Sequence, residues 1–227
     1  MPKAKLNFTS GVTLLGASPD RSGSDAALAL APALICADGG ANDLPEGRSP
    51  DAIIGDLDSL VDRAGWARRL GARLIEVEEQ ESTDLEKCLS RIDAPFILAC
   101  GFLGGRIDHQ LAALHALIAE PRPLILIGAE DVIVSAGRAL RLELRTGDRI
   151  GLFPMRKVVA GPDAGLRWPL QRRTFEAGGR IGTSNEAAGA VRLTFDRPGV
   201  AALLPRARLD VALKGLLNRP ASGPDGS

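Results

Sequence analysis

Short apolar runs alternate with longer helical patterns along the first part of the chain. The runs are rich in Val, Ile and Leu, and Pro or Gly follows several of the helical patterns, as expected where helices end. This alternation predicts a parallel sheet with helices on both faces, an N-terminal Rossmann-like α/β domain over residues 1–128. The expected strands are residues 12–15, 34–37, 52–54, 73–77, 96–99 and 124–127, and the expected helices are residues 24–31, 62–70, 83–92 and 108–119.

The pattern changes after about residue 128. Apolar and polar residues alternate with period two in residues 139–144, 191–195 and 208–213, and Gly- and Pro-containing turns separate these segments. No long helical pattern stands out, so we expect an antiparallel β-sandwich domain over residues 129–217. The last ten residues, 218–227, are rich in Pro, Gly and Ser and are expected to be a disordered tail.

Composition narrows the choice of partners. Among 227 residues, Lys+Arg and Asp+Glu are equal at 28 each, so no overall positive charge favours nucleic acid. The apolar runs are too short to span a bilayer, and the first residues do not form a signal peptide. The three cysteines form no CxxC pair. These features indicate a cytoplasmic protein that binds neither nucleic acid nor a membrane.

Acidic residues follow successive predicted strands. Asp38 follows the second strand, Asp56 and Asp58 follow the third, Asp84 the fourth and Asp108 the fifth. Ligands of open α/β sheets bind at the carboxyl ends of the strands. Helix capping explains a single Asp at such a place, but two carboxylates two residues apart in extended backbone point the same way and repel. A divalent cation removes this repulsion, and Mg²⁺ prefers carboxylate and phosphate oxygens.

Glycines and an arginine accompany these acids. Gly39-Gly40 and Gly104-Gly105 allow backbone N–H groups to approach an anion, and helices that begin near Thr83 and Asp108 add positive dipole ends. Arg106 offers a planar guanidinium that suits a phosphate. The sequence contains neither GxxxxGK[ST] nor GxGxxG. The pattern therefore predicts a magnesium-dependent enzyme that transfers phosphate groups from a nucleotide, without a Walker-type site.

At these positions the sequence resembles the thiamine pyrophosphokinase family. The segments that carry the resemblance are DGGAN at 38–42, GDLDS at 55–59, QESTD at 80–84, GGRIDH at 104–109, GLRWPL at 165–170 and GTSNE at 182–186. The resemblance spans about residues 12–213. It implies transfer of the β,γ-diphosphate of ATP to the hydroxyl of thiamine, giving thiamine diphosphate and AMP. It also implies a homodimer that binds thiamine where the two subunits meet.

The resemblance further implies a role for each matching residue. The catalytic set is Asp56, Asp58, Asp84, Arg106 and Asp108, and the first three of these hold magnesium. The thiamine side consists of Trp168, Ser184 and Asn185. Residues on the nucleotide side are Gly39, Gly40, Asn42, Gln80, Thr83, Gly104, Gly105 and His109.

Some questions stay open at this point. Glu81 stands where the family more often has Asp. Trp168 is either a packed core residue or a flat aromatic surface for a cationic substrate. A related diphosphokinase acting on another alcohol, such as a pterin, is one alternative function. A non-catalytic regulator that binds nucleotide or thiamine is the other.

Overall fold

The computed structural model describes residues 5–45 and 47–219. Most of the expected tail, residues 220–227, therefore lies outside the described residues. The chain forms two compact units: the residues up to Ala116 together with Leu126–Ala129, and Leu117–Ile125 together with the residues from Glu130 onward. No helix within the described ranges combines the length and the apolar character needed to cross a membrane.

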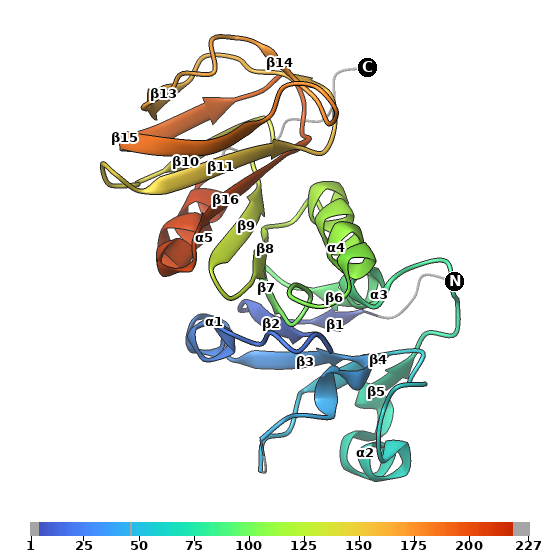
Figure 1. The fold of residues 1–227 in the computed structure, drawn as a ribbon. Coiled ribbons are helices and arrows are strands. Elements are labelled where there is room, and N and C mark those ends of the chain that lie inside the picture. Colours follow the sequence, from blue (N-terminus) through green and yellow to red (C-terminus); the bar gives the residue numbers. More distant parts are fainter. Residues whose placement is uncertain (1–4, 46, 220–227) are drawn as a thin grey trace. The chain divides into compact units, whose positions relative to one another are not determined.

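A parallel sheet forms the centre of the first unit, as predicted (Figure 1). Its strands follow the order β7-β2-β3-β4-β5, and β8 comes next to β7. Every residue of β2, β4, β7 and β8 is buried, which explains why these strands read as continuous apolar runs. The bounds are β2 (Val12–Leu15), β3 (Ala33–Ala37), β4 (Ala52–Gly55), β5 (Leu74–Glu76), β7 (Ile97–Cys100) and β8 (Leu124–Ile127).

Helices and short turns connect these strands. The predicted capping box is confirmed: the Thr83 hydroxyl accepts from the N–H of Glu86, and the Glu86 carboxylate accepts from the N–H of Thr83. A short parallel pair, β1 (Leu6–Asn7) with β6 (Ile92–Asp93), lies outside the main sheet. The other elements are α1 (Ser24–Leu30), the 3₁₀ turn η1 (Asp38–Ala41), α2 (Arg63–Leu70), η2 (Gly71–Arg73), α3 (Asp84–Arg91) and α4 (Ile107–Ala119).

The second unit is an antiparallel β-sandwich, again as predicted. Its strand order is β10-β15-β11-β16-β9, with β13 also paired to β15. The long strand β15 pairs with β11 near its start and with β10 near its end, so one strand serves both parts of the sandwich. The bounds are β9 (Asp131–Ser135), β10 (Ala139–Leu142), β11 (Arg149–Pro154), β12 (Val158–Val159), β13 (Ala164–Leu166), β14 (Thr174–Phe175), β15 (Gly182–Thr194) and β16 (Val200–Pro205).

The strand expected at residues 208–213 is wrong. This segment lies in the 3₁₀ turn η3 (Arg206–Arg208) and in helix α5 (Leu209–Leu217). Leu209, Ala212, Leu213 and Leu216 are all buried, with spacings of three and four residues. Six residues fit the period of two of a strand as well as the period of 3.6 of a helix. The apolar spacing distinguishes the two only when the pattern is followed on to Leu217.

Candidate active site

A pocket of about 500 Å³ lies in the first unit at the carboxyl ends of several parallel strands. We call it the acidic pocket. It contains most of the side chains that the sequence analysis selected in this half of the chain. Its functional lining comprises Ser18, Asp38, Asp56, Gln80, Thr83, Asp84, Lys87, Gly105, Arg106 and His109.

Three carboxylates gather at this place. One oxygen from each of Asp38, Asp56 and Asp58 lies within 4.8 Å of the others, a group of acids that could hold a metal ion. Asp56 and Asp58 thus lie together as expected, but not through extended backbone, because Leu57 between them has a φ of 64°. The chain turns at Leu57 and buries that side chain while the flanking acids stay accessible. The position of Asp38 after the second strand predicted its place at this edge of the sheet, but Asp38 was not among the predicted metal ligands.

Gly55 makes the approach of Asp38 possible. A Cβ atom at Gly55 would lie 2.7 Å from the Cβ of Asp38, closer than real side chains pack. Asp38 opens the turn η1 with a φ of 41°, a left-handed conformation that Asp adopts more readily than most residues. The first glycine of the GDLDS segment therefore brings two acidic loops together.

Asp38 has the features of a cation ligand. Its side chain is buried, and its Oδ1 has no hydrogen-bond partner within residues 5–45 and 47–219. Its Oδ2 accepts a hydrogen bond of 3.3 Å from the N–H of Ser59. Burial raises the pKa of Asp38, and the neighbouring Asp56 adds to that rise. A buried carboxylate oxygen without a donor is costly, and a bound cation would satisfy it.

Lys87 places a positive charge in the acidic pocket, and its role was not predicted from the sequence. Its ammonium is buried, with 3% of the side chain exposed, and it donates to Asp56 Oδ2 at 2.7 Å. Asp84 Oδ1 lies 3.8 Å from the same nitrogen. Burial alone would lower the pKa of Lys87, but the hydrogen bond and charge of Asp56, with Asp84 and Glu79, raise it. The only sequence signal was its position one helical turn after Asp84.

The pKa values of its two acidic partners shift in different directions. The hydrogen bond from Lys87 lowers the pKa of Asp56, and a further bond of 3.2 Å from Gln80 Nε2 acts in the same direction. Burial raises the pKa of Asp84, and the negative charge of Asp38 adds to this effect. Thr83 lines the pocket and also caps the helix that carries Asp84 and Lys87.

Arg106 and Asp108 form an exposed pair near the start of α4. Arg106 donates from Nε at 3.1 Å and from Nη2 at 2.5 Å to the two oxygens of Asp108. This bidentate contact lowers the pKa of Asp108 and holds the guanidinium in one orientation. His109 lines the pocket beside them. Gly105 also lines it, whereas Gly104 (φ 79°) packs against Asp20.

Three residues expected on the nucleotide side hold the local backbone instead of lining the pocket. A Cβ at Gly40 would meet the carbonyl oxygen of Leu15 at 2.2 Å, and Gly39 packs beside Ser59. The amide of Asn42 donates to the Ser59 carbonyl at 2.8 Å and accepts from the N–H of Val61 at 2.9 Å. These contacts position the loop after Asp58.

Comparison with known proteins finds matches for both units of the chain. A family model described as "Thiamin pyrophosphokinase, catalytic domain" matches residues 25–126, and a second, "Thiamin pyrophosphokinase, vitamin B1 binding domain", matches residues 139–200. Thiamine pyrophosphokinase 1 of Oryza sativa subsp. japonica is 32% identical over 197 residues, covering 71% of this chain and 75% of the rice protein. The chain belongs to the thiamine pyrophosphokinase family. Thiamine pyrophosphokinase 1 of Arabidopsis thaliana is also 32% identical, over 185 residues that cover 66% of this chain and 69% of that protein.

Solved structures of the family share the fold. The thiamin pyrophosphokinase from Candida albicans superposes with a TM-score of 0.72 at 16% identity, covering 90% of this chain and 94% of that one. The yeast thiamin pyrophosphokinase gives a TM-score of 0.71 at 19% identity, covering 92% and 93%. At such identities the match establishes the α/β plus β-sandwich fold.

The remaining predicted residues lie in the second unit, in the region matched by the thiamine pyrophosphokinase B1-binding model. Trp168 is 52% exposed, so the core-packing interpretation is wrong, and the Arg167 guanidinium lies 4.9 Å from the ring centroid. Asn185 is buried, and its side-chain amide bonds the backbone of Trp168. The amide oxygen accepts from the Trp168 N–H at 3.2 Å, and the amide nitrogen donates to the Trp168 carbonyl at 2.7 Å. Ser184 has a φ of 61°. Asn185 thus fixes the backbone that presents Trp168.

Proposed function

We propose that this chain transfers the β,γ-diphosphate of ATP to thiamine. The hydroxyl oxygen of thiamine attacks the β-phosphorus, the bond from that phosphorus to the oxygen bridging to the α-phosphate breaks, and AMP leaves. The products are thiamine diphosphate and AMP, and the hydroxyl proton is released. Membership of a family whose named relatives are thiamine pyrophosphokinases supports this reaction.

The observation that carries the proposal is the gathering of Asp38, Asp56 and Asp58 within 4.8 Å of one another. The first two of these acids line a pocket that is also lined by Arg106. Phosphate transfer needs little covalent help from a protein, but it needs charge neutralisation and in-line positioning. A pocket with only carboxylates would repel a triphosphate, so these acids make sense as ligands of a cation that accompanies it.

We assign magnesium to Asp38, Asp56 and Asp58, with Asp84 beside them. This set replaces Asp84 by Asp38 among the direct ligands because Asp38 supplies the buried, unpartnered oxygen. When bound, Mg²⁺ would neutralise phosphate charge as a Lewis acid. The donor set consists of hard carboxylate oxygens, which suits this ion.

The chain's own residues have distinct parts in this proposal. Arg106, oriented by Asp108, contacts phosphate oxygens through its planar guanidinium. Lys87 keeps Asp56 ionised and in place through its 2.7 Å hydrogen bond. Thr83 caps helix α3, which begins with Asp84. Gln80 donates a hydrogen bond to the carboxylate of Asp56.

The acceptor belongs to the second unit in this proposal. An exposed Trp168, held by Asn185 and preceded by Arg167, offers an aromatic surface next to polar groups. We further propose that the protein is a homodimer, with thiamine bound where the subunits meet, and that it works in the cytoplasm. Three free and buried cysteines agree with a reducing compartment.

The direct test is incubation with ATP, Mg²⁺ and thiamine, followed by mass spectrometry of the products. We expect thiamine diphosphate and AMP in equal amounts. The same assay with a panel of other alcohols, including pterin-type alcohols, tests the first alternative, a related diphosphokinase that acts on a different acceptor. AMP formed only with a pterin alcohol would identify a different diphosphokinase, and tight ATP binding without any turnover would identify a regulator.

The variant that tests the metal assignment is Asp58→Asn. Its side chain is exposed, so folding should be unaffected, and we expect AMP formation to fall at least 100-fold because one cation ligand loses its charge (about 3 kcal/mol of barrier). Asp93→Asn, an exposed aspartate outside the pocket, serves as the matched control and should retain full activity. Undiminished magnesium-dependent turnover in Asp58→Asn contradicts the assignment.

A further inference from the structure

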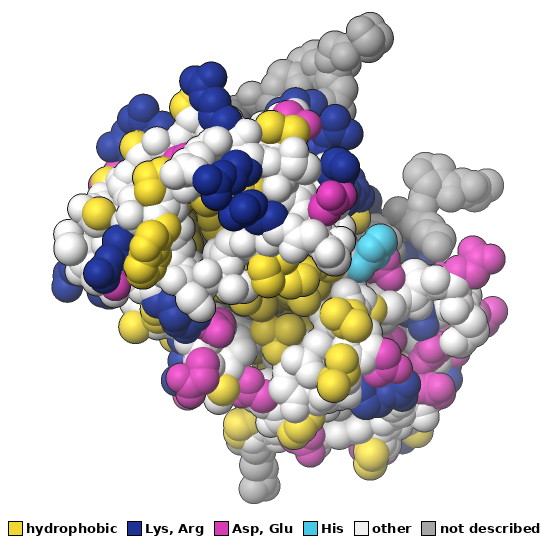
Figure 2. Space-filling view, turned by 45° about the horizontal axis from the view of Figure 1, so that its top comes forward, with side chains coloured by type: hydrophobic (Ala, Val, Ile, Leu, Met, Phe, Trp, Pro, Cys, Tyr) yellow, Lys and Arg dark blue, Asp and Glu magenta, His cyan; other side chains and the backbone are white. Residues whose placement is uncertain are grey.

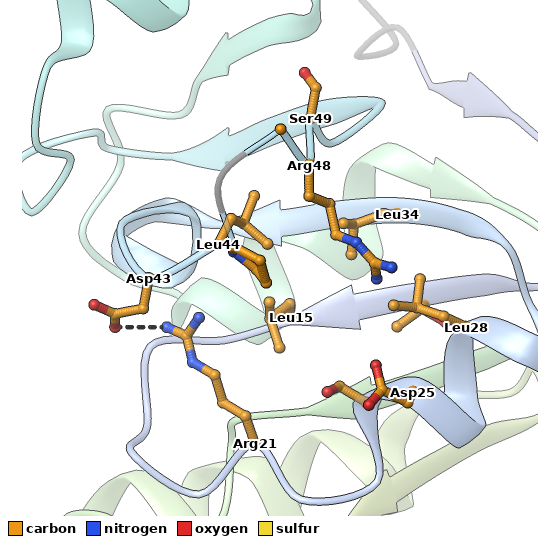
Figure 3. A pocket seen from close by; sticks show the side chains of 13 residues that line it. Leu15, Arg21, Asp25, Leu28, Leu34, Asp43, Leu44, Arg48 and Ser49 are labelled. Carbon is orange, nitrogen blue, oxygen red and sulfur yellow. Dashed lines mark hydrogen bonds and ion pairs between the residues drawn. The ribbon is translucent and has the colours of Figure 1, made fainter.

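A second pocket in the first unit shares no lining residue with the acidic pocket. Its volume is about 690 Å³, within the range of small-molecule sites. We call it the arginine pocket (Figure 3). Helix α1 forms one wall, and residues 43–45 and 47–49 form another. Among residues 42–45 and 47–51, the described part of the chain between η1 and β4, no helix covers the surface over β2 and β3 beside α1.

The floor of the arginine pocket is apolar. Leu15 and Leu34 extend from the parallel strands, Leu28 from α1, and Leu44 and Pro45 from the connecting segment. Figure 3 shows the four leucine side chains around one open space. Such a floor suits the flat face of a ring system rather than a small hydrated ion.

Charged groups stand around this floor. Arg21 bonds Asp43 through Nη2 at 3.1 Å, but its Nη1 is buried and has no hydrogen-bond partner among residues 5–45 and 47–219. Arg48 is exposed at the rim, and its guanidinium lies on the other side of Leu15 from that of Arg21 (Figure 3). Asp25 adds a carboxylate on the α1 wall. A ligand that matches these groups has an anionic group for Arg48 and N–H donors for Asp25.

We propose that the arginine pocket is a second, non-catalytic site for a purine nucleoside monophosphate. The phosphate pairs with the exposed guanidinium group of Arg48, the base lies on the leucine floor, and its amino group donates to Asp25. AMP is the natural candidate because the proposed reaction forms it, so the site would sense product. The role of the site in sensing product rests on the proposed function. The binding of AMP to the site does not require turnover.

Equilibrium dialysis with radiolabelled AMP tests the site. EDTA is present, so that the acidic pocket has no cation and its carboxylates repel the phosphate. We expect one AMP per chain. Arg48→Glu should weaken binding at least tenfold, and the matched control Arg68→Glu, an exposed arginine on α2, should leave it unchanged. Thermal melting confirms that both variants are folded.

The same experiment defines what overturns the inference. Absence of AMP binding by the wild-type chain, or unchanged binding by folded Arg48→Glu, rules the site out. Ribose 5-phosphate, which lacks the base, should bind at least tenfold more weakly, and equal binding would reduce the pocket to a general phosphate site. If the chain produces no thiamine diphosphate but binds AMP in the arginine pocket, the proposed function is wrong and this inference is supported.

Discussion

At the residue scale, the acidic pocket depends on how a buried lysine and several carboxylates share charge. Lys87 is almost fully buried, yet its pKa is raised because it contacts Asp56 and lies near Asp84. Asp38, which is buried, and Asp84, which is partly exposed, have raised pKa values, while that of Asp56 is lowered. The pocket therefore contains one firmly ionised carboxylate beside two that bind protons more readily.

We expect Lys87→Met to lower the free energy of unfolding by about 3 kcal/mol at neutral pH, because it leaves Asp56 charged without its partner. The pKa of Asp56 is depressed in the folded state, so its contribution is present above the ordinary value of 3.8 and disappears as pH falls through the folded-state pKa. The raised pKa of Lys87 preserves the ion pair up to and beyond its ordinary value of 10.5. The difference between wild type and variant should thus persist from mildly acidic to alkaline pH and shrink in strong acid.

Urea unfolding at neutral pH and at a pH well below 3.8 measures this change. Lys157→Met is the matched control, because Lys157 pairs with Glu176 at 3.3 Å on the surface, where both side chains are largely exposed. Its effect should stay below about 1 kcal/mol. Equal losses in the two variants would mean that the buried ion pair contributes no more than a surface one.

At the element scale, helix α3 links stability to the site. Its capping box fixes the first turn, which begins with Asp84, and its next residues carry Lys87 into the pocket. The loop before it folds around the Glu79 carboxylate, which accepts from the N–H groups of Glu81 and Ser82. Local sequence rules predicted this helix start correctly, because a capping box involves residues only three apart.

We expect Thr83→Ala to destabilise the protein by about 1 kcal/mol and also to reduce turnover, because the first turn of α3 carries a pocket carboxylate. Asp62→Ala is the control. It removes the cap of α2, where Asp62 Oδ1 accepts from the N–H of Gly65 at 3.0 Å, away from the pocket. Urea unfolding should give similar losses for both, whereas only Thr83→Ala should slow AMP formation. Equal rates in the two variants would show that the cap has no link to catalysis.

At the scale of the whole molecule, a net charge of zero conceals an imbalance. The first unit contains 11 Lys+Arg against 17 Asp+Glu, and the second contains 17 against 11. Figure 2 shows side chains of both signs on the visible face. The unit with the acidic pocket is therefore the negative one, and a triphosphate approaching it gains most from an accompanying cation.

Removing divalent cations should accordingly abolish AMP formation, and added Mg²⁺ should restore it. A second readout does not depend on activity: Mg²⁺ should raise the melting temperature of the wild-type chain, since a ligand at 100 times its Kd stabilises the folded state by about 2.7 kcal/mol. Asp58→Asn should lose this shift. An identical shift in both proteins would place the cation elsewhere.

The sequence by itself determined the alternation of strands and helices, the capping box and the arrival of acids at one edge of a sheet, because these depend on near neighbours and on parallel topology. The tertiary structure decided the rest. It turned residues 209–217 into a helix, brought Asp38 against Gly55, buried Lys87 and opened the arginine pocket over Leu15 and Leu34. These features depend on which distant segments pack together and which side chains lose their water, and no short window of sequence contains that information.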